Sequence, residues 1–178
     1  MPNAIMDPTA QPHTARQDGL ALAPREASLE GARIGLLENG KQNARRFLEE
    51  LAQVLEERYG ATPTMIRRKT VITEPAPPEI AAELRDHCDV VITGVGDCGS
   101  CSASAVHDGV LFERAGTPAA VICSDAFRAT ADAMAEVQGA PGYHYLTTPH
   151  PVAGLAPDQV HERADALAAQ VAELLAAR

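Results

Sequence analysis

Two cysteines three positions apart form the most reactive grouping in the chain, Cys98-Gly99-Ser100-Cys101. They stand between a buried-strand pattern and a helical pattern, so the pair is expected where a helix begins. Unpaired backbone N–H groups and the positive end of the helix dipole stabilise a thiolate at that place. Cys-x-x-Cys thiols at helix starts have pKa values lowered to roughly 3.5–7.5. We therefore expect Cys98 to be a nucleophile and Cys101 to be the thiol that resolves its adducts.

Two other interpretations of the same pair remain open. Both cysteines could be small, unreactive core residues, although a cysteine pair flanked by glycine in a loop is a poor core element. They could also be half of a zinc site. No second Cys-x-x-Cys and no spaced pair of histidines follows in the sequence, so a structural zinc site is not expected.

His150 is the residue best suited to acid–base chemistry. It stands between Pro149 and Pro151, and prolines restrict the backbone and so hold the imidazole in place. An imidazole titrates near neutral pH and can serve as a general acid or base. Asp97, directly before the cysteine pair, is a second group expected to assist proton transfer. The alternative for His150 is an ordinary histidine in a surface loop.

Several other residues are candidates for the same site, although their types and positions are less specific signals. Cys123 ends a predicted buried strand and is either a core residue or a third thiol of the site. Lys41 could bind an anionic group of a substrate or lower the pKa of a thiol, and His107 could face the site or pack beneath it. We expect the substrate to be bound by Asn39, Lys41, Gly99, Ser100, Ser102 and His107.

These residues must be positioned by elements that alternate between strand and helix. Apolar runs predict strands at 33–37, 64–73, 89–94, 118–123 and 143–148, and helical periodicity predicts helices at 43–59, 79–86, 102–115, 125–137 and 157–177. This alternation predicts an α/β three-layer domain with an open, mainly parallel five-stranded sheet and helices on both faces. The expected fold is flavodoxin-like or Rossmann-like, spanning 31–178, preceded by a flexible N-terminal arm at 1–30.

The predicted topology brings the reactive residues together. In an open parallel sheet, ligands bind at the carboxyl ends of the strands. Asn39 and Lys41, the cysteine pair, Cys123 and His150 all follow directly after predicted strands. This convergence is the strongest functional signal that the residues give.

Composition excludes several classes of protein. The formal net charge is −9 and aromatic residues make up 3%, which argues against nucleic acid, whose binding needs basic faces and stacking rings. No stretch approaches the ~18 apolar residues of a membrane span, and the N-terminus lacks a secretory signal. We therefore expect a cytoplasmic protein in which thiols are mostly reduced. A small-molecule substrate is expected, and a homo-oligomer is left open.

Several separated motifs resemble the UGSC family, named for a selenocysteine-Gly-Ser-Cys motif after a strand. They are the run from Asp89 to Gly109, the run from Glu113 to Phe127, the early Leu37-Glu38-Asn39-Gly40-Lys41-Gln42-Asn43-Ala44 and the late Pro149-His150-Pro151. The resemblance covers about residues 30–175. A more distant likeness is to the selenocysteine subunit of glycine reductase protein B.

The resemblance implies a redox-capable nucleophile at Cys98, where family members can carry selenocysteine. Sulfur at this position departs from the selenoprotein pattern, since a thiol is less acidic and a poorer leaving group. The resemblance supports the location of the site more than the identity of its substrate.

Three hypotheses about function follow. The first is a thiol-dependent oxidoreductase or reductive lyase without a bound cofactor, in which an external thiol or dithiol reduces the Cys98–Cys101 disulfide after each turnover. The second is a non-redox lyase, hydrolase or racemase-like enzyme that uses Cys98 with Cys123. The third is a subunit that presents its cysteine pair to a reductant protein or a larger reductase complex.

Overall fold

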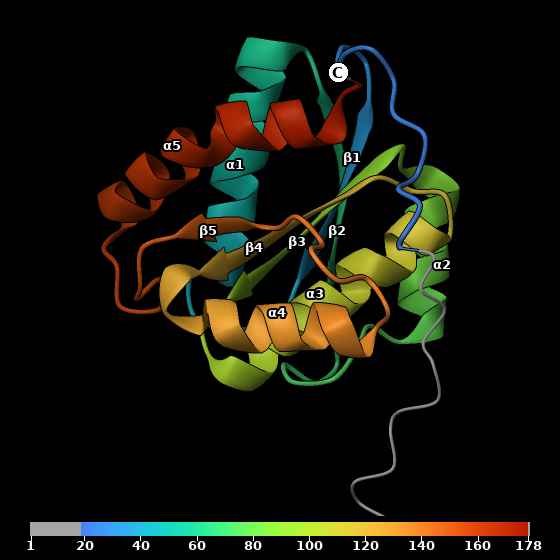
Figure 1. The fold of residues 1–178 in the computed structure, drawn as a ribbon. Helices are drawn as coiled ribbons and strands as arrows, with labels where there is room; N and C mark the ends of the chain where they lie inside the picture. The colour runs from blue at the N-terminus through green and yellow to red at the C-terminus, as the bar shows by residue number, and fades with distance from the viewer. Residues whose placement is uncertain (1–18, 178) are drawn as a thin grey trace, which may run out of the picture.

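The computed structural model describes residues 19–177, which form one five-stranded sheet flanked by helices (Figure 1). All strand pairs are parallel, and the strand order is β2-β1-β3-β4-β5. The predicted α/β class and flavodoxin-like or Rossmann-like architecture are confirmed. The elements are β1 Arg33–Glu38, α1 Ala44–Tyr59, β2 Thr62–Arg68, α2 Pro78–His87, β3 Val90–Gly96, α3 Gly99–Arg114, β4 Ala119–Ser124, a 3-10 turn Asp125–Phe127, α4 Arg128–Val137, β5 Leu146–Thr148 and α5 Pro157–Leu175.

The apolar content of each strand follows its place in the sheet. Every residue of β3 and β4 is buried, because helices cover both faces of a parallel sheet and leave no face for polar side chains. β2 lies at an edge of the sheet and is exposed or half-buried throughout.

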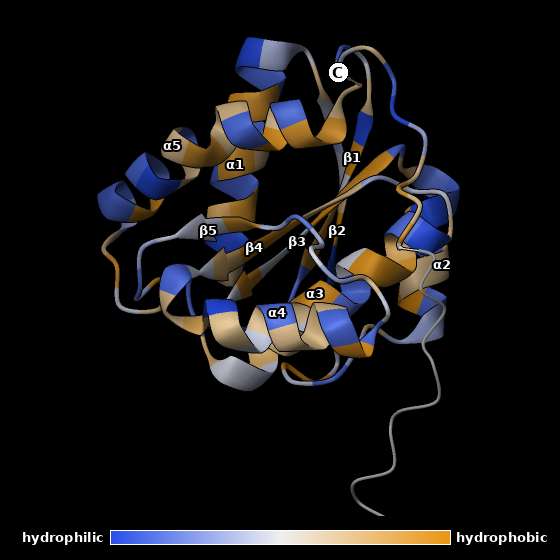
Figure 2. Cartoon of the chain, in the orientation of Figure 1, coloured by the Kyte–Doolittle hydropathy of each residue, from blue (hydrophilic) through white to orange (hydrophobic). Residues whose placement is uncertain are grey.

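The helices form a layer on each side of the sheet. α1 and α5 lie together on one face, and α2, α3 and α4 cover the other (Figure 1). Hydrophobic residues gather in the strands and on the helix faces turned toward them, while hydrophilic residues take the outer faces (Figure 2). This burial is the main stabilising contribution of the fold.

The boundaries of several elements differ from the prediction. β3 continues to Gly96, two residues beyond the predicted end, so the cysteine pair follows the strand almost directly. β5 begins only at Leu146, because Gly142 has a positive φ and the chain turns there before it can extend. The predicted helix at 125–137 is divided into the 3-10 turn and α4.

Part of the predicted N-terminal arm packs on the domain. Arg25 forms an ion pair with the fully buried carboxylate of Glu113 at 2.7 Å, and its Nε donates to the Leu174 carbonyl at 3.0 Å. The Ala177 N–H donates to the Glu26 carbonyl at 2.7 Å. Residues 19–30 are therefore part of the fold and not a free arm, because a buried carboxylate needs these donors. Residues 1–18 of the predicted arm lie outside the described residues.

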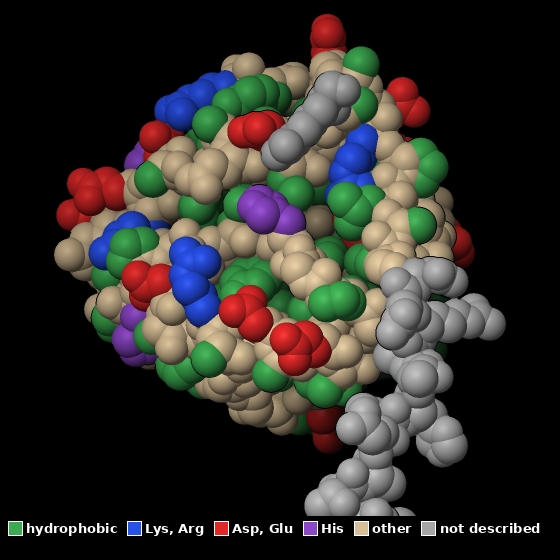
Figure 3. Space-filling model, viewed as in Figure 1, with side chains coloured by type: hydrophobic (Ala, Val, Ile, Leu, Met, Phe, Trp, Pro, Cys, Tyr) green, Lys and Arg blue, Asp and Glu red, His purple; other side chains and the backbone are tan. Residues whose placement is uncertain are grey.

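The chain carries an excess of acidic residues, with a formal net charge of −9. Acidic and basic side chains are interspersed on the face shown in Figure 3. Within residues 19–177, no helix has the length and apolar character that crossing a membrane requires.

Candidate functional site

The cysteine pair lies at the junction of β3 and α3, as its position in the sequence predicts. Cys98 is the extended N-cap residue of α3, and its Sγ accepts the backbone N–H of Cys101 at 3.2 Å. The two sulfurs form a disulfide, with Cα atoms 5.3 Å apart. That separation lies within the ordinary range for bridged cysteines. The backbone therefore allows the pair to pass between dithiol and disulfide.

The two sulfurs differ in their access to solvent. Cys98 is half-buried, whereas Cys101 is 1% exposed and lies beneath it in the first turn of α3. Ser100 is exposed, and its Oγ lies 3.7 Å from the Cys98 Sγ. Gly99 adds no side chain, and a Cβ there would meet only Thr130 Oγ1 at 3.8 Å. Of the two sulfurs, that of Cys98 is therefore the more accessible, and that of Cys101 lies below it.

Asp97 is a buried carboxylate with four hydrogen-bond donors around it. It accepts from Ser124 Oγ at 2.7 Å, from His150 Nδ1 at 3.0 Å and from the N–H groups of Val152 and Ala153 at 2.9–3.1 Å. Burial raises the pKa of this carboxyl, but these hydrogen bonds outweigh burial and hold its pKa below the usual value. The lowered pKa favours the ionised form of Asp97, which holds His150, Ser124 and the loop after His150 in place. Its part in proton transfer stays a prediction.

His150 is held by Asp97 and remains open to solvent on its other side. Its backbone N–H donates to Asp125 Oδ1 at 3.0 Å, and its ring meets Phe127 edge to face with centroids 5.2 Å apart. The side chain is 40% exposed. Because the Asp97 carboxylate can only accept at Nδ1, the neutral ring carries its lone pair on Nε2. That nitrogen can take or give a proton.

Ser124 is a member of this network that the sequence did not single out. Its Oγ is fully buried, 2.7 Å from Asp97 Oδ1, 3.1 Å from the Gly96 carbonyl and 3.4 Å from His150 Nδ1. The one signal for it in the sequence was that Ser124 is polar and comes directly after the predicted strand 118–123. Ser124 thus joins the ends of β3 and β4 beneath the imidazole.

Two predicted substrate-binding residues have structural roles. The Ser102 hydroxyl is fully buried and donates to the Gly96 carbonyl at 3.0 Å. Asn39 is 2% exposed, its Nδ2 donates to the Val95 carbonyl at 2.8 Å and its Oδ1 accepts from Lys41 N–H. Both side chains hydrogen-bond the backbone at the ends of β1 and β3, and their part in substrate binding stays a prediction.

The structure also argues against Cys123 as a second catalytic thiol. Its side chain is fully buried, and this burial raises its pKa to about 12. A neutral buried thiol is a poor nucleophile. Cys123 instead limits the space around Gly96, where an added Cβ would lie 2.8 Å from its Sγ.

Lys41 and His107 differ from the residues above, because their polar side-chain atoms are not all hydrogen-bonded within residues 19–177. Lys41 lies at the end of β1 beside a polar hollow that Asn43 and Arg46 also line. Asn43 holds the loop after His150 through bonds from Nδ2 to the carbonyls of Val152 and Leu155 at 3.0 Å. His107 is half-buried on α3, its Nδ1 has no partner among residues 19–177, and burial lowers its pKa.

A buried ion pair on the α2 side of α3 was not expected from the sequence. Lys69 Nζ lies 2.6 Å from Asp108 Oδ2, each side chain being 1% exposed, and it also donates to Ser104 Oγ. Ser104 in turn donates to the Glu74 carbonyl at 2.6 Å. These contacts fasten the loop after β2 to the helix that carries the cysteines. Within the described part of the chain, no group of three or more His, Cys, Asp or Glu side chains is arranged to hold a metal.

A family model described as the UGSC family matches residues 4–177, which is almost the whole chain. No curated protein matches the sequence.

Proposed function

The chain belongs to the UGSC family, and from this premise we propose that it is a thiol-dependent oxidoreductase or reductive lyase acting on a small electrophile. The observation that carries the proposal is the Cys98–Cys101 pair at the start of α3, with Cys98 accessible and Cys101 buried below it. The Asp97–His150 pair lies at the same edge of the sheet, where the strands end.

The first step is attack by the Cys98 thiolate on the substrate. For a substrate R–X, in which X is a leaving group on sulfur, selenium, oxygen or carbon, a bond forms between Cys98 Sγ and R, and X departs with the electron pair of the R–X bond. The Cys101 N–H at 3.2 Å and the start of α3 stabilise the thiolate beforehand. Protonated His150 Nε2 supplies the proton that the leaving group takes.

The second step returns the fragment R to solution. The Cys101 thiolate attacks Cys98 Sγ, a disulfide forms, and R leaves with the electron pair of the Cys98–R bond and gains the proton given up by the Cys101 thiol. The substrate has then gained two electrons and the cysteine pair has lost two. An external dithiol reduces the disulfide and is itself oxidised.

Two cysteine variants test this cycle with bis(2-hydroxyethyl) disulfide as substrate and dithiothreitol as reductant. We expect Cys98→Ser to lose turnover to the uncatalysed level, because no accessible thiolate remains. Without dithiothreitol, Cys101→Ser should form a stable mixed disulfide on Cys98, seen as a mass increase that maps to this residue. With dithiothreitol present, its turnover should fall at least about 100-fold. Intact-mass spectrometry and a thiol-release assay measure the two effects.

The matched control is Cys123→Ala, which removes a thiol of the same domain. It should keep its turnover, since Cys123 is buried away from solvent. Full activity of Cys101→Ser without added dithiol, together with loss of activity in Cys123→Ala, would contradict the redox cycle and support a non-redox pair of thiols.

A further inference from the structure

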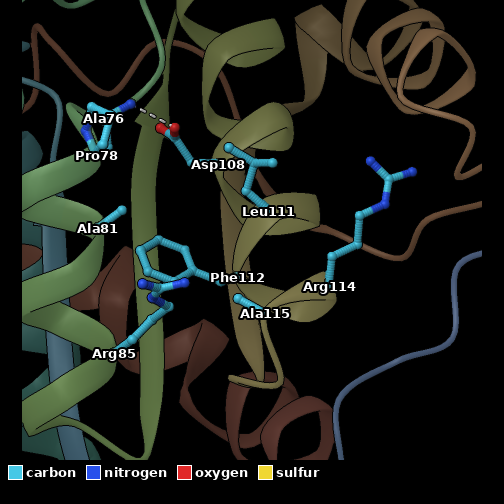
Figure 4. Close-up of a pocket in the computed structure, with 9 residues that line it drawn as sticks. All are labelled: Ala76, Pro78, Ala81, Arg85, Asp108, Leu111, Phe112, Arg114 and Ala115. Carbon is cyan, nitrogen blue, oxygen red and sulfur yellow. Dashed lines mark hydrogen bonds between the residues drawn. The ribbon is translucent and has the colours of Figure 1, made fainter.

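A second hollow lies between α2 and the C-terminal half of α3, whereas the cysteines occupy the first turn of α3 (Figure 4). Its volume is about 370 Å³, within the range of roughly 300–1,000 Å³ typical of small-molecule sites. The proposed chemistry of Cys98 does not use it. Its lining includes Ala81, Arg85, Asp108, Leu111, Phe112 and Ala115.

The middle of this hollow is apolar and incompletely covered. Ala81 on α2 and Leu111 on α3 lie on opposite walls, and the short side chains of Ala81 and Ala115 leave the space open (Figure 4). Leu111 is 41% exposed, which is unusual for a large apolar side chain on a helix that is otherwise packed. A ligand with a hydrocarbon body would remove this surface from water.

One end of the hollow carries a cation without an internal partner. Arg85 reaches from α2 toward Phe112 (Figure 4), and within residues 19–177 its guanidinium has no hydrogen bond or ion pair. A guanidinium is a planar fork of donors that matches a carboxylate. Arg85 is exposed, so its guanidinium can be reached by an anion from solvent.

The other end of the hollow does not repel an anion. The Asp108 carboxylate accepts from the Ala76 N–H at 2.8 Å, which Figure 4 shows, and from Lys69 Nζ at 2.6 Å. Its charge is therefore balanced by the buried Lys69. The lining residues therefore present two cations, Arg85 and Arg114, next to a hydrocarbon wall, and the one carboxylate among them is balanced by Lys69.

We propose that this hollow binds a small organic carboxylate with an apolar body. The carboxylate pairs with Arg85, and the hydrocarbon lies between Ala81 and Leu111. Arg114 is not part of this recognition, because its side chain points away from Ala81 and Phe112 and donates to the Gln138 carbonyl (Figure 4).

Hexanoate titrated into the full chain tests the proposal, followed by amide 1H–15N spectra. We expect saturable shifts in α2 and the second half of α3, and at least about tenfold weaker binding of hexan-1-ol, which has the same body without the charge. Arg85→Gln should weaken hexanoate to the same degree. Arg114→Gln, the matched control, should bind hexanoate as the unchanged chain does.

Three results would overturn the proposal. They are the absence of shifts at millimolar hexanoate, shifts that map elsewhere, and equal affinity in Arg85→Gln. Self-association would also overturn it. If Leu111→Asp lowers the mass of the protein in sedimentation, a second copy of the chain covers this face, and the small-molecule site is refuted. Thermal melts of each variant establish that it is folded before the titration.

Discussion

At the scale of single residues, the site depends on a carboxylate that holds its neighbours in place. Asp97 gathers the imidazole of His150, the hydroxyl of Ser124 and two backbone N–H groups around two oxygens. Removing its charge would leave those donors without their acceptor. Orientation of His150 and the conformation of the loop that follows it therefore depend on the same side chain.

Asp97→Asn is expected to lower turnover about 10²- to 10⁴-fold, because the amide can present an N–H to Nδ1 and so favour the wrong tautomer of His150. The measurement is the rate of disulfide reduction as a function of pH. Asp89→Asn is the matched control. Asp89 also has a lowered pKa, from its hydrogen bond with Arg33, but it lies at the opposite end of β3. Equal loss in both variants would contradict the positioning role.

Asp97 also predicts how stability responds to acid. Its pKa is lowered in the folded protein, so its ionised form stabilises the fold above the ordinary pKa of an aspartate, about 4. This contribution is lost as pH falls through the lower folded value. Urea unfolding between pH 6 and pH 3 should show a steeper loss of unfolding free energy in the unchanged chain than in Asp97→Asn. If the unfolding free energies of the two proteins fall in parallel with pH, this prediction is refuted.

At the scale of elements, α3 determines both the site and its packing. Its first turn carries the cysteines, and its middle approaches β4 so closely that a Cβ at Gly109 would lie 2.2 Å from Val121 Cγ2 and 2.6 Å from the Tyr143 hydroxyl. The β4 side chain is buried in the sheet and cannot move aside. Glycine is needed at position 109 because a larger residue would collide with its neighbours, and not because of the backbone angles there.

Gly109→Ala is expected to lower the free energy of unfolding by about 1–3 kcal/mol, the usual cost of forcing extra volume into a packed core. Chemical denaturation at pH 7 measures it. Gly116→Ala is not a suitable comparison, because Gly116 has a positive φ. Gly99→Ala is the better control, since Gly99 also lies in α3, a Cβ there meets only an ordinary contact, and helix propensity favours alanine over glycine at both positions. An equal loss in Gly99→Ala would contradict crowding as the cause of the loss in Gly109→Ala.

The sequence predicts the elements well where a single physical pattern dominates. The apolar runs of β3 and β4 and the periodicity of α1 and α5 identify those elements, and the carboxyl edge of the parallel sheet locates the cysteines beside the Asp97–His150 pair. The hydrogen bonds of Ser102 and Asn39 to backbone carbonyls were not predicted, because a polar residue near a reactive one looks the same in sequence whether it faces a substrate or a backbone carbonyl. Lys69 and Glu113 were missed since their partners lie 39 and 88 residues away.

At the scale of the whole molecule, one buried charge ties three distant segments together. Glu113 at the end of α3 accepts from Arg25 and from the N–H groups of Ala23 and Ala119, and Arg25 also reaches the last turn of α5 through Leu174. The N-terminal segment, α3 and α5 are therefore joined at the edge where the strands begin.

Arg25→Met is expected to cost about 3–5 kcal/mol of unfolding free energy, because it leaves the Glu113 carboxylate buried without its cation. Arg25→Met combined with Glu113→Gln should recover part of the loss, since no unpaired charge then remains. Arg33→Met, which breaks a pair exposed on both sides, should change stability by less than about 1 kcal/mol. Thermal and urea unfolding of the four proteins measure the differences.

The hydrogen bond from Ala177 to Glu26 has a practical consequence for attaching the protein to a surface. It places residue 177 at the edge where the strands begin, whereas the cysteine pair lies where they end (Figure 1). A molecule tethered through a C-terminal linker would turn Cys98 outward into solution. Immobilised films made this way should give every molecule the same orientation and leave the thiol open to electrodes or soluble reductants.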